Sequence, residues 1–271
     1  MGRDLLERLR IRAVLVLVMV FILVEGAAAC DAVSDVLDAK VVGVPDGATL
    51  ILSSGEKVRL SGIQAPKLYA PDEAGMNWPL AEDARDRLDA LAAGQAIALS
   101  AGKAVRDRHG RLIGQTYLAD GTWLQREMIA DGLARAYSFA DNRDCAAELL
   151  AAERQARADR LGIWNDPFYA VRDAAKPQAI LARAGAFELV EGRVLTAAKS
   201  GATVYLNFGR YWKEDFTVTI DARAQKLFAA AGIDPLVYDG ALIRVRGWVE
   251  DHDGPRIAVT HPEQIEVLAT P

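Results

Sequence analysis

Two short stretches of the sequence carry the side chains best suited to chemistry. The first, Asp46-Gly47-Ala48-Thr49, places a carboxylate in a glycine turn. The second, Arg59-Leu60-Ser61-Gly62-Ile63-Gln64-Ala65-Pro66-Lys67, brings an arginine and a lysine. The planar guanidinium of arginine matches a pair of phosphate oxygens. The stretches therefore have the frame of a phosphodiester-cleaving site, but most of the acidic residues that would hold a metal ion are missing from it.

Other common chemistries find little support in the sequence. His109, His252 and His261 have no metal-ligand spacing, and the two cysteines form no CxxC motif. The sequence also lacks a glycine-rich phosphate loop and the G-x-S-x-G motif of serine hydrolases. Phosphate chemistry is thus the best supported class.

The composition indicates a folded protein without a general attraction to nucleic acid. Of the 271 residues, 51% are hydrophobic, and the formal net charge is −5. This length allows two modest domains with cores of their own. A dedicated DNA-binding protein usually has a basic face and often a basic total charge. Any nucleic-acid site in this chain must therefore rest on local positive charge.

Residues 1–29 have the pattern of a signal peptide. Arg3, Arg8, Arg10 and Arg12 precede an apolar run from Ala13 to Val24, and Ala27-Ala28-Ala29 supplies the small residues that a signal peptidase recognises. The apolar run is shorter than the roughly 20 residues of a membrane-spanning helix. An uncleaved membrane anchor is the alternative. We expect an exported protein of the periplasm or cell envelope.

The two cysteines allow two interpretations. Cys30 would be the first residue after cleavage, and small residues followed by a cysteine resemble a bacterial lipoprotein signal, which would anchor the protein by a lipid. The alternative is a disulfide between Cys30 and Cys145, which an oxidising compartment permits. The sequence leaves both open.

The first part of the chain combines short predicted strands with helices. Apolar and polar residues alternate in the strands, whereas the helices place apolar residues on one face. Glycines follow the first two helices, as expected for helix ends. The predicted strands are 40–44, 49–52, 57–60, 96–99 and 112–118, and the predicted helices are 80–93, 123–131 and 145–160.

Residues 186–271 return to a strand-rich pattern. Three strands, one helix and two or three further strands follow in the order of an OB-fold barrel. We therefore predict two domains, 40–165 and 186–271, joined by a linker with a helical patch at 166–185. The predicted strands of the second domain are 187–195, 203–208, 216–220, 242–249, 257–259 and 265–268, and its helix is 222–231.

Five motifs in the same order as in a known family support a resemblance. They are D-G-x-T at 46–49, R-L-x-x-I-x-A-P at 59–66, D-x-x-G-R at 107–111, D-G-L-A-x-A-Y at 131–137, and E-x-x-A-R…G-I-W at 153–164. Residues 40–164 thereby resemble the staphylococcal-nuclease-like (SNase, thermonuclease) family. The resemblance implies an OB-fold barrel with helices, so the expected fold is mainly β plus α, with a second OB-like β-barrel domain behind it. That second domain looks like an appendage found on some exported bacterial members.

The resemblance also implies a catalytic site from which this chain departs. In that family a calcium ion between carboxylates polarises the phosphate, a glutamate helps a water molecule to attack, and two arginines hold the phosphate oxygens. The two phosphate arginines correspond to Arg59 and Arg111, and the outer acidic residue of the turn corresponds to Asp46. Two metal-binding aspartates and the glutamate are replaced, in turn, by Ala48, Gln64 and Lys67.

These replacements remove both the metal and the base that the resemblance implies. Calcium takes about six to eight oxygen ligands, which Asp46 alone does not supply. The ammonium of Lys67 cannot accept a proton at neutral pH. Without a metal, Arg59, Arg111 and Lys67 face one carboxylate, so the pocket is net positive. We expect it to bind a phosphate-like anion without a cofactor and without a bound metal.

Two alternatives compete with an anion-binding pocket. Arg59 would be purely structural if it formed a pair with Asp46. A rearranged active site would recruit other acids, such as Asp72 or Glu73 in the loop after Pro71, and would then depend on calcium.

Further side chains are candidate ligand contacts. Arg108 and His109 lie in the turn before Arg111, which contacts nucleotide in the family, and Tyr137 and Phe139 match aromatic positions that stack on a base. Each of them has a plain surface or core role as its alternative. A basic aromatic strip on the second domain is another candidate, formed by Tyr205, Phe208, Arg210, Tyr211, Trp212 and Lys213.

Three functions remain in competition. The first is an exported, catalytically impaired SNase-like protein that binds nucleic acid or another phosphate-like anion. The second is an active calcium-dependent nuclease, and the third is an envelope protein-interaction module with a vestigial pocket. The missing carboxylates favour the first over the second, while the acidic net charge favours the third, because strong nucleic-acid binding relies on basic surface. The oligomeric state is not predicted.

Overall fold

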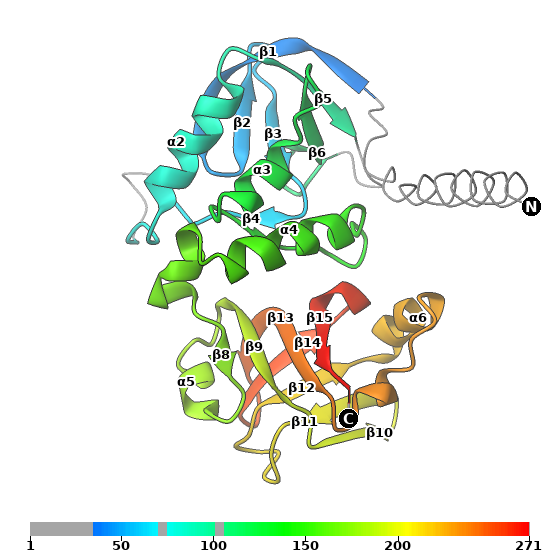
Figure 1. Cartoon of the computed structure of the whole chain (residues 1–271). Coiled ribbons are helices and arrows are strands. Elements are labelled where there is room, and N and C mark those ends of the chain that lie inside the picture. The colour runs from blue at the N-terminus through cyan, green and yellow to red at the C-terminus, as the bar shows by residue number, and fades with distance from the viewer. Residues whose placement is uncertain (1–34, 70–74, 101–105, 271) are drawn as a thin grey trace, which may run out of the picture. The chain divides into compact units, whose positions relative to one another are not determined.

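A computed structural model describes residues 35–69, 75–100 and 106–270, with the side chains from residue 39 onward. The predicted signal peptide, Cys30, Asp72 and Glu73 lie outside the described residues. Val33–Pro271 forms one compact unit, which contains two β assemblies (Figure 1). Within the described ranges, none of the helices is long and apolar enough to cross a membrane.

The first assembly, here called the N-terminal barrel, is a closed barrel with the strand order β1-β2-β3-β6-β5. Its inward-facing residues, such as Leu50, Leu52, Val58 and Leu60, are fully buried. Burying each such side chain contributes about 1.5–3 kcal/mol of transfer free energy. The strands are β1 (Asp35–Asp46), β2 (Thr49–Leu52), β3 (Lys57–Leu60), β5 (Ala96–Ser100) and β6 (Leu112–Leu118).

Three helices accompany this barrel: the first two pack on its strands and on each other, and the third packs on the second (Figure 1). They are α2 (Ala81–Ala92), α3 (Leu124–Ala130) and α4 (Ala146–Ala158). Glu82 and Asp83 lie in the first turn of α2, where negative charge complements the helix dipole. A two-stranded sheet of β4 (Ile63–Gln64) and β7 (Arg135–Ala136) joins the barrel to the helices. Two 3₁₀ turns follow α4, namely η1 (Gly162–Asn165) and η2 (Pro167–Tyr169).

Gly132 and Gly162 explain two of the sequence motifs. Both have positive φ angles, 69° and 48°, and their backbones cross so closely that a Cβ on either would meet a carbonyl group of the other segment. The N–H of Ile163 donates to the carbonyl of Gly132 at 2.8 Å. The contact ties the end of the helical region to the turn between α3 and β7, so both glycines are sterically required.

The second assembly, here called the C-terminal sheet, is one curled sheet of eight strands in the order β10-β11-β12-β14-β13-β9-β8, with β15 paired to β13. Its core contains Phe216, Ile243, Val245 and Ile257. The strands are β8 (Arg172–Asp173), β9 (Phe187–Arg193), β10 (Thr196–Ser200), β11 (Thr203–Asn207), β12 (Thr217–Ile220), β13 (Leu242–Asp251), β14 (Pro255–Val259) and β15 (Ile265–Ala269). The helical segments are α5 (Pro177–Leu181), α6 (Ala222–Ala230), η3 (Pro235–Tyr238) and η4 (Pro262–Gln264).

The predicted fold class is confirmed: an OB-type barrel with helices is followed by a second OB-like β assembly. Strand β10 was not predicted, because its side chains are largely exposed and show no apolar alternation. The segment expected as a linker, 166–185, carries β8, which pairs with β9. It also carries α5, whose Ile180 lies in the core of the C-terminal sheet. The domain boundaries themselves stay a prediction.

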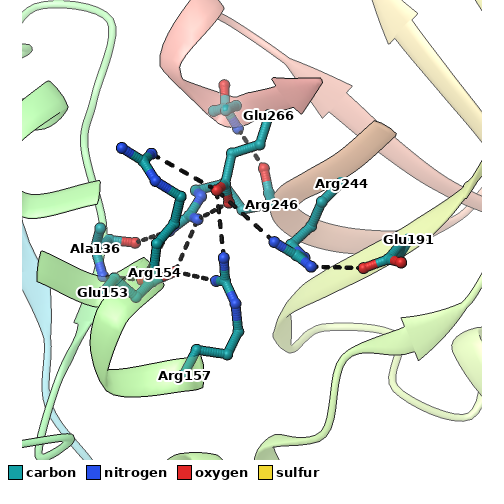
Figure 2. A network of polar contacts seen from close by, with 9 residues as sticks. Ala136, Glu153, Arg154, Arg157, Glu191, Arg244, Arg246 and Glu266 are labelled. Carbon is teal, nitrogen blue, oxygen red and sulfur yellow. Dashed lines mark hydrogen bonds and ion pairs between the residues drawn. The ribbon is translucent and has the colours of Figure 1, made fainter. Parts of the chain in front are cut away.

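A buried ion network joins the two assemblies (Figure 2). Arg246 on β13 donates to both carboxylate oxygens of Glu153 on α4, each at 2.9 Å, and to Glu266 at 2.6 Å. Arg157 also binds both carboxylates, at 2.7 Å to Glu153 and 3.3 Å to Glu266. The N–H of Ala136 donates to Glu153 at 2.6 Å. Removing one partner of a buried ion pair leaves the other charge buried without compensation. Separating the two assemblies is therefore unfavourable, and the network holds the C-terminal sheet on the helical side of the barrel.

Candidate functional site

The Asp46–Thr49 turn connects β1 to β2 at the edge of the barrel. One carboxylate oxygen of Asp46 accepts the N–H of Ala48 at 2.8 Å, so the aspartate supports the turn as well as lining the site. Ala48 is only 2% exposed. The hydroxyl of Thr49 is buried and has no hydrogen-bond partner within the described residues. The turn thus offers one carboxylate and one unused hydroxyl.

Arg59 on β3 is held by backbone rather than by a carboxylate. Its guanidinium donates to the carbonyl of Ala48 at 2.9 Å and to the carbonyl of Ile63 at 3.0 Å. Burial lowers the pKa of Arg59, while the nearby charge of Asp46 raises it. A guanidinium has five N–H donors, so this anchoring leaves donors for a ligand. The hydrogen bonds do not support a purely structural pair with Asp46.

Arg111 reaches the same region from the turn before β6. Strands β3 and β6 are parallel neighbours, with Arg59 opposite Ile113, so the turn places Arg111 beside the end of β3. The side chain of Arg111 donates to Asp107 at 2.7 Å. Burial raises the pKa of Asp107, but the hydrogen bonds from Arg111 and from backbone N–H groups outweigh it and lower the pKa. Asp107 therefore remains charged and orients Arg111.

Gln64 and Lys67 occupy the positions where the resemblance implies acids. Because β4 pairs with β7, Gln64 lies opposite Arg135, and its side-chain oxygen accepts from Arg135 at 2.8 Å. Burial lowers the pKa of Arg135 to about 10, against the opposing effect of Glu188 and Glu153. The ammonium of Lys67 lies 3.8 Å from the centre of the Tyr69 ring. Gln64 thus engages a cation, whereas Lys67 is itself a cation that lies over an aromatic ring.

These residues surround one cavity of about 550 Å³, here called the arginine pocket. The cations Arg59, Arg111 and Lys67 outnumber the carboxylates Asp46 and Asp107, so the local charge is positive by one. Such a pocket suits a phosphate group, whose oxygens accept charge-assisted hydrogen bonds. Its walls are formed by Asp46, Ala48, Thr49, Arg59, Gln64, Ala65, Pro66, Lys67, Leu68, Tyr69, Trp78, Arg111, Gly185 and Trp248.

The described residues of the arginine pocket do not fit a calcium ion. Among the described lining residues, Asp46 alone carries a carboxylate. The side-chain oxygen of Gln64 already accepts a hydrogen bond from Arg135. Across the described ranges, no group of three or more His, Cys, Asp or Glu side chains is arranged to hold a metal ion. A calcium site normally gathers several carboxylates to balance the charge. The described residues therefore do not support a metal-assisted step.

The other predicted contacts lie around the pocket rather than in its wall. Arg108 and His109 are exposed in the turn and contact each other, at 3.2 Å between ring and guanidinium nitrogens. Tyr137 and Phe139 pack edge to face with centroids 4.6 Å apart. Among the described residues, neither aromatic side chain lines the cavity; Trp248 does.

The aromatic strip of the C-terminal sheet is only partly assembled. Tyr205 and Trp212 line a second cavity of about 460 Å³ together with His252 and Arg256. Phe208 instead packs against the core beside Phe216, with ring centroids 4.9 Å apart. The strip residues are therefore divided between surface and core.

Several residues that the sequence analysis did not single out also shape the pocket. Arg135 engages Gln64. Tyr69 and Trp78 line the cavity, and Trp248 and Gly185 reach it from the C-terminal assembly. Their sequence signals are weak, because a strand pattern shows which residues share a face but not what that face contacts. Cys145 is disulfide-bonded, and Cys30, the other cysteine of the sequence, lies outside the described residues.

A closed five-stranded barrel with helices and an arginine pocket at its edge defines an OB-fold protein of the nuclease type. Residues 57–166 match the family described as staphylococcal nuclease homologue. The chain is 31% identical over 130 residues to an uncharacterized endonuclease of Escherichia coli O157:H7, covering 47% of this chain and 76% of that protein. It is 30% identical over 139 residues to the micrococcal nuclease of Shigella flexneri, covering 47% of this chain and 74% of that protein.

The chain belongs to the staphylococcal nuclease (SNase) family. Some relatives are much longer: the chain is 31% identical over 133 residues to the endonuclease YhcR of Bacillus subtilis (strain 168), covering 45% of this chain and 11% of that protein. The matched family segment ends at residue 166, so the C-terminal sheet lies beyond it.

Proposed function

We propose that this SNase-family protein is exported, binds nucleic acid or another phosphate-like anion in the arginine pocket without calcium, and is impaired in hydrolysis. The observation that carries the proposal is the arrangement of three cations around a cavity whose described lining holds the single carboxylate of Asp46. Nuclease names among the relatives support a phosphodiester as the ligand class.

The geometry suits binding more than hydrolysis. Arg59 is fixed by two carbonyls and Arg111 by Asp107, so both forks are oriented before a ligand arrives. Pre-orientation reduces the entropy lost on binding. Lys67 adds charge at the exposed rim but, as an ammonium, does not activate a water molecule. The signal-peptide pattern of residues 1–29 supports export.

A combined cleavage and binding assay tests the proposal. Purified protein lacking the predicted signal peptide is mixed with labelled single-stranded DNA in calcium, and separately in chelator, and both product and bound fraction are measured. We expect binding that survives the chelator and no cleavage. Cleavage that requires calcium would overturn the proposal and direct attention to Asp72 and Glu73 as ligands. Absence of both cleavage and binding would favour the protein-interaction function.

Restoring the acids tests the explanation for the impairment. The triple variant Ala48→Asp, Gln64→Asp, Lys67→Glu supplies the carboxylates that calcium requires, so calorimetry should detect calcium binding at millimolar concentration. The triple variant Ala48→Asn, Gln64→Asn, Lys67→Gln is the matched control, with similar shapes and no added negative charge, and should bind none. No binding by the acidic variant would mean that the missing carboxylates alone do not explain the loss.

A further inference from the structure

The arginine pocket is not built by the nuclease-type barrel alone. Trp248, on strand β13 of the C-terminal sheet, and Gly185 line the same cavity as Arg59 and Arg111. Gly185 is held to this strand, because its N–H donates to the carbonyl of Val249 at 2.8 Å. The indole of Trp248 remains 48% exposed. One wall of the pocket is therefore an accessible aromatic side chain contributed by the second assembly.

Tyr137 fixes the orientation of this indole. The ring N–H of Trp248 donates to the hydroxyl of Tyr137 at 3.0 Å. Tyr137 packs edge to face on Phe187, with centroids 4.7 Å apart, and Phe187 lies directly opposite Trp248 in the pairing of β9 with β13. Tyr137, which was expected to stack on a base, thus supports the indole of Trp248, and Trp248 itself lines the cavity.

The strand that carries Trp248 is also fixed in place. Alternate residues of a strand point to the same face, so Arg246 and Trp248 both face the N-terminal barrel. Arg246 is buried between Glu153 and Glu266 (Figure 2), and it donates to the carbonyl of Ala136, the residue before Tyr137, at 3.1 Å. The same contacts that join the assemblies therefore set the distance between the indole and the arginine side of the pocket.

An indole adds nothing to the binding of a bare phosphate but stacks well on a nucleobase. We infer that Trp248 is a specificity-determining residue that stacks on the base of a nucleotide whose phosphate is held by Arg59 and Arg111. The inference rests on the proposed anion-binding function. It assigns the ligand preference of this chain to its C-terminal sheet, with Tyr137 as a positioning residue.

The test compares ligands with and without a base on the variants Trp248→Ala and Trp248→Phe. Dissociation constants for thymidine 5′-monophosphate, ribose 5-phosphate and inorganic phosphate are measured by calorimetry in chelator. We expect Trp248→Ala to weaken binding of the nucleotide about 5- to 150-fold, the range for losing one stacked base. The other two ligands should change less than twofold. Trp248→Phe should recover most of the nucleotide affinity.

Two further variants separate stacking from general disturbance. Trp212→Ala removes a tryptophan that is 56% exposed and lines the other cavity, so it should leave all three affinities unchanged. Tyr137→Phe removes the hydroxyl that orients the indole and should weaken only the nucleotide, by a few fold. Thermal unfolding checks that each variant is folded.

The outcomes distinguish this inference from the proposed function. If the unsubstituted protein binds none of the three ligands, the anion-binding function fails and the inference fails with it. If it binds them and Trp248→Ala leaves the nucleotide affinity unchanged, the inference alone is overturned. Equal losses for inorganic phosphate and nucleotide would also overturn it, because the tryptophan would then support the pocket rather than read the base.

Discussion

Arg246 and Arg59 occupy opposite kinds of surroundings. Arg246, between the assemblies, donates to the carboxylates of Glu153 and Glu266, whereas Arg59, at the pocket, donates to two backbone carbonyls. Burial tends to lower the pKa of both. The two carboxylates outweigh this effect and raise the pKa of Arg246, whereas the pKa of Arg59 stays lowered.

Arg246 is thus a cation with a structural role, whereas Arg59 is a cation available to bind a ligand. The charge of Arg246 is neutralised within the fold, and removing it would leave Glu153 buried with less positive charge around it. The charge of Arg59 is only partly balanced, by the more distant effect of Asp46. A bound anion would balance the remaining charge of Arg59. The difference between the two arginines can be tested by substituting each of them.

The largest effect is expected at the interface. Arg246→Ala leaves Glu153 with Arg157 as its remaining ion-pair partner, so the free energy of unfolding should fall by about 3–5 kcal/mol. Arg256→Ala is the matched control, because it breaks the more exposed pair with Glu250 and should lower the unfolding free energy by at most about 1 kcal/mol. Urea unfolding followed by circular dichroism measures both free energies. Similar losses in the two variants would show that the buried network contributes no more to stability than the exposed pair.

Acidification should weaken the same interface through His261. This side chain is buried between Ser138 and Thr260, at 2.7 and 2.9 Å from its two ring nitrogens. Burial lowers its pKa from 6.5 to about 4, with Arg143 and Arg246 acting in the same direction and Glu263 and Asp141 against it. Between these two pH values the unfolded chain binds a proton that the folded protein does not.

Stability is therefore lost as the pH falls from about 6.5 towards 4, by up to about 3 kcal/mol for this histidine. Carboxylates titrate in the same window, so the measured quantity is the difference between the unsubstituted protein and His261→Gln in urea unfolding at pH 7 and pH 4.5. The variant should lose less stability on acidification. A parallel loss in both proteins would show that His261 does not titrate as described.

A smaller effect on stability, but a specific effect on binding, is expected at the pocket. Arg59→Lys keeps the positive charge but loses the planar fork, so the affinity for inorganic phosphate should fall about tenfold, in the range for one charge-assisted hydrogen bond. Arg108→Lys, on the exposed turn, is the control and should change it less than twofold. If Arg59→Lys lowers the unfolding free energy as much as Arg246→Ala does, Arg59 is a structural arginine after all.

The sequence predicts what depends on local sterics and periodicity. Gly132 is recognisable as the glycine that ends a helix, and the strands of the barrel are recognisable from their short apolar runs between turns. The family motifs point to Arg59 and Arg111, which the structure brings to one cavity. The loss of the three acids is equally visible, because Ala48, Gln64 and Lys67 occupy their positions in otherwise intact motifs.

The contacts between the assemblies could not be predicted in the same way. Trp248 and Tyr137 are separated by 111 positions in the chain, and nothing in either local pattern indicates the other. The motif shows that Gln64 replaces an aspartate, but only the pairing of β4 with β7 shows that its side-chain oxygen accepts from Arg135. Such contacts depend on how separate elements dock, which periodicity within one element does not encode.

The location of Arg246 late in the chain has a consequence for synthesis. The N-terminal barrel and α4 leave the ribosome first, and Glu153 precedes Arg246 by 93 positions. Until β13 has been translated and paired, the carboxylate of Glu153 lacks that partner and the pocket lacks the wall formed by Trp248. A nascent or truncated chain thus exposes the barrel's docking face to water, and only a completely translated molecule presents the finished pocket.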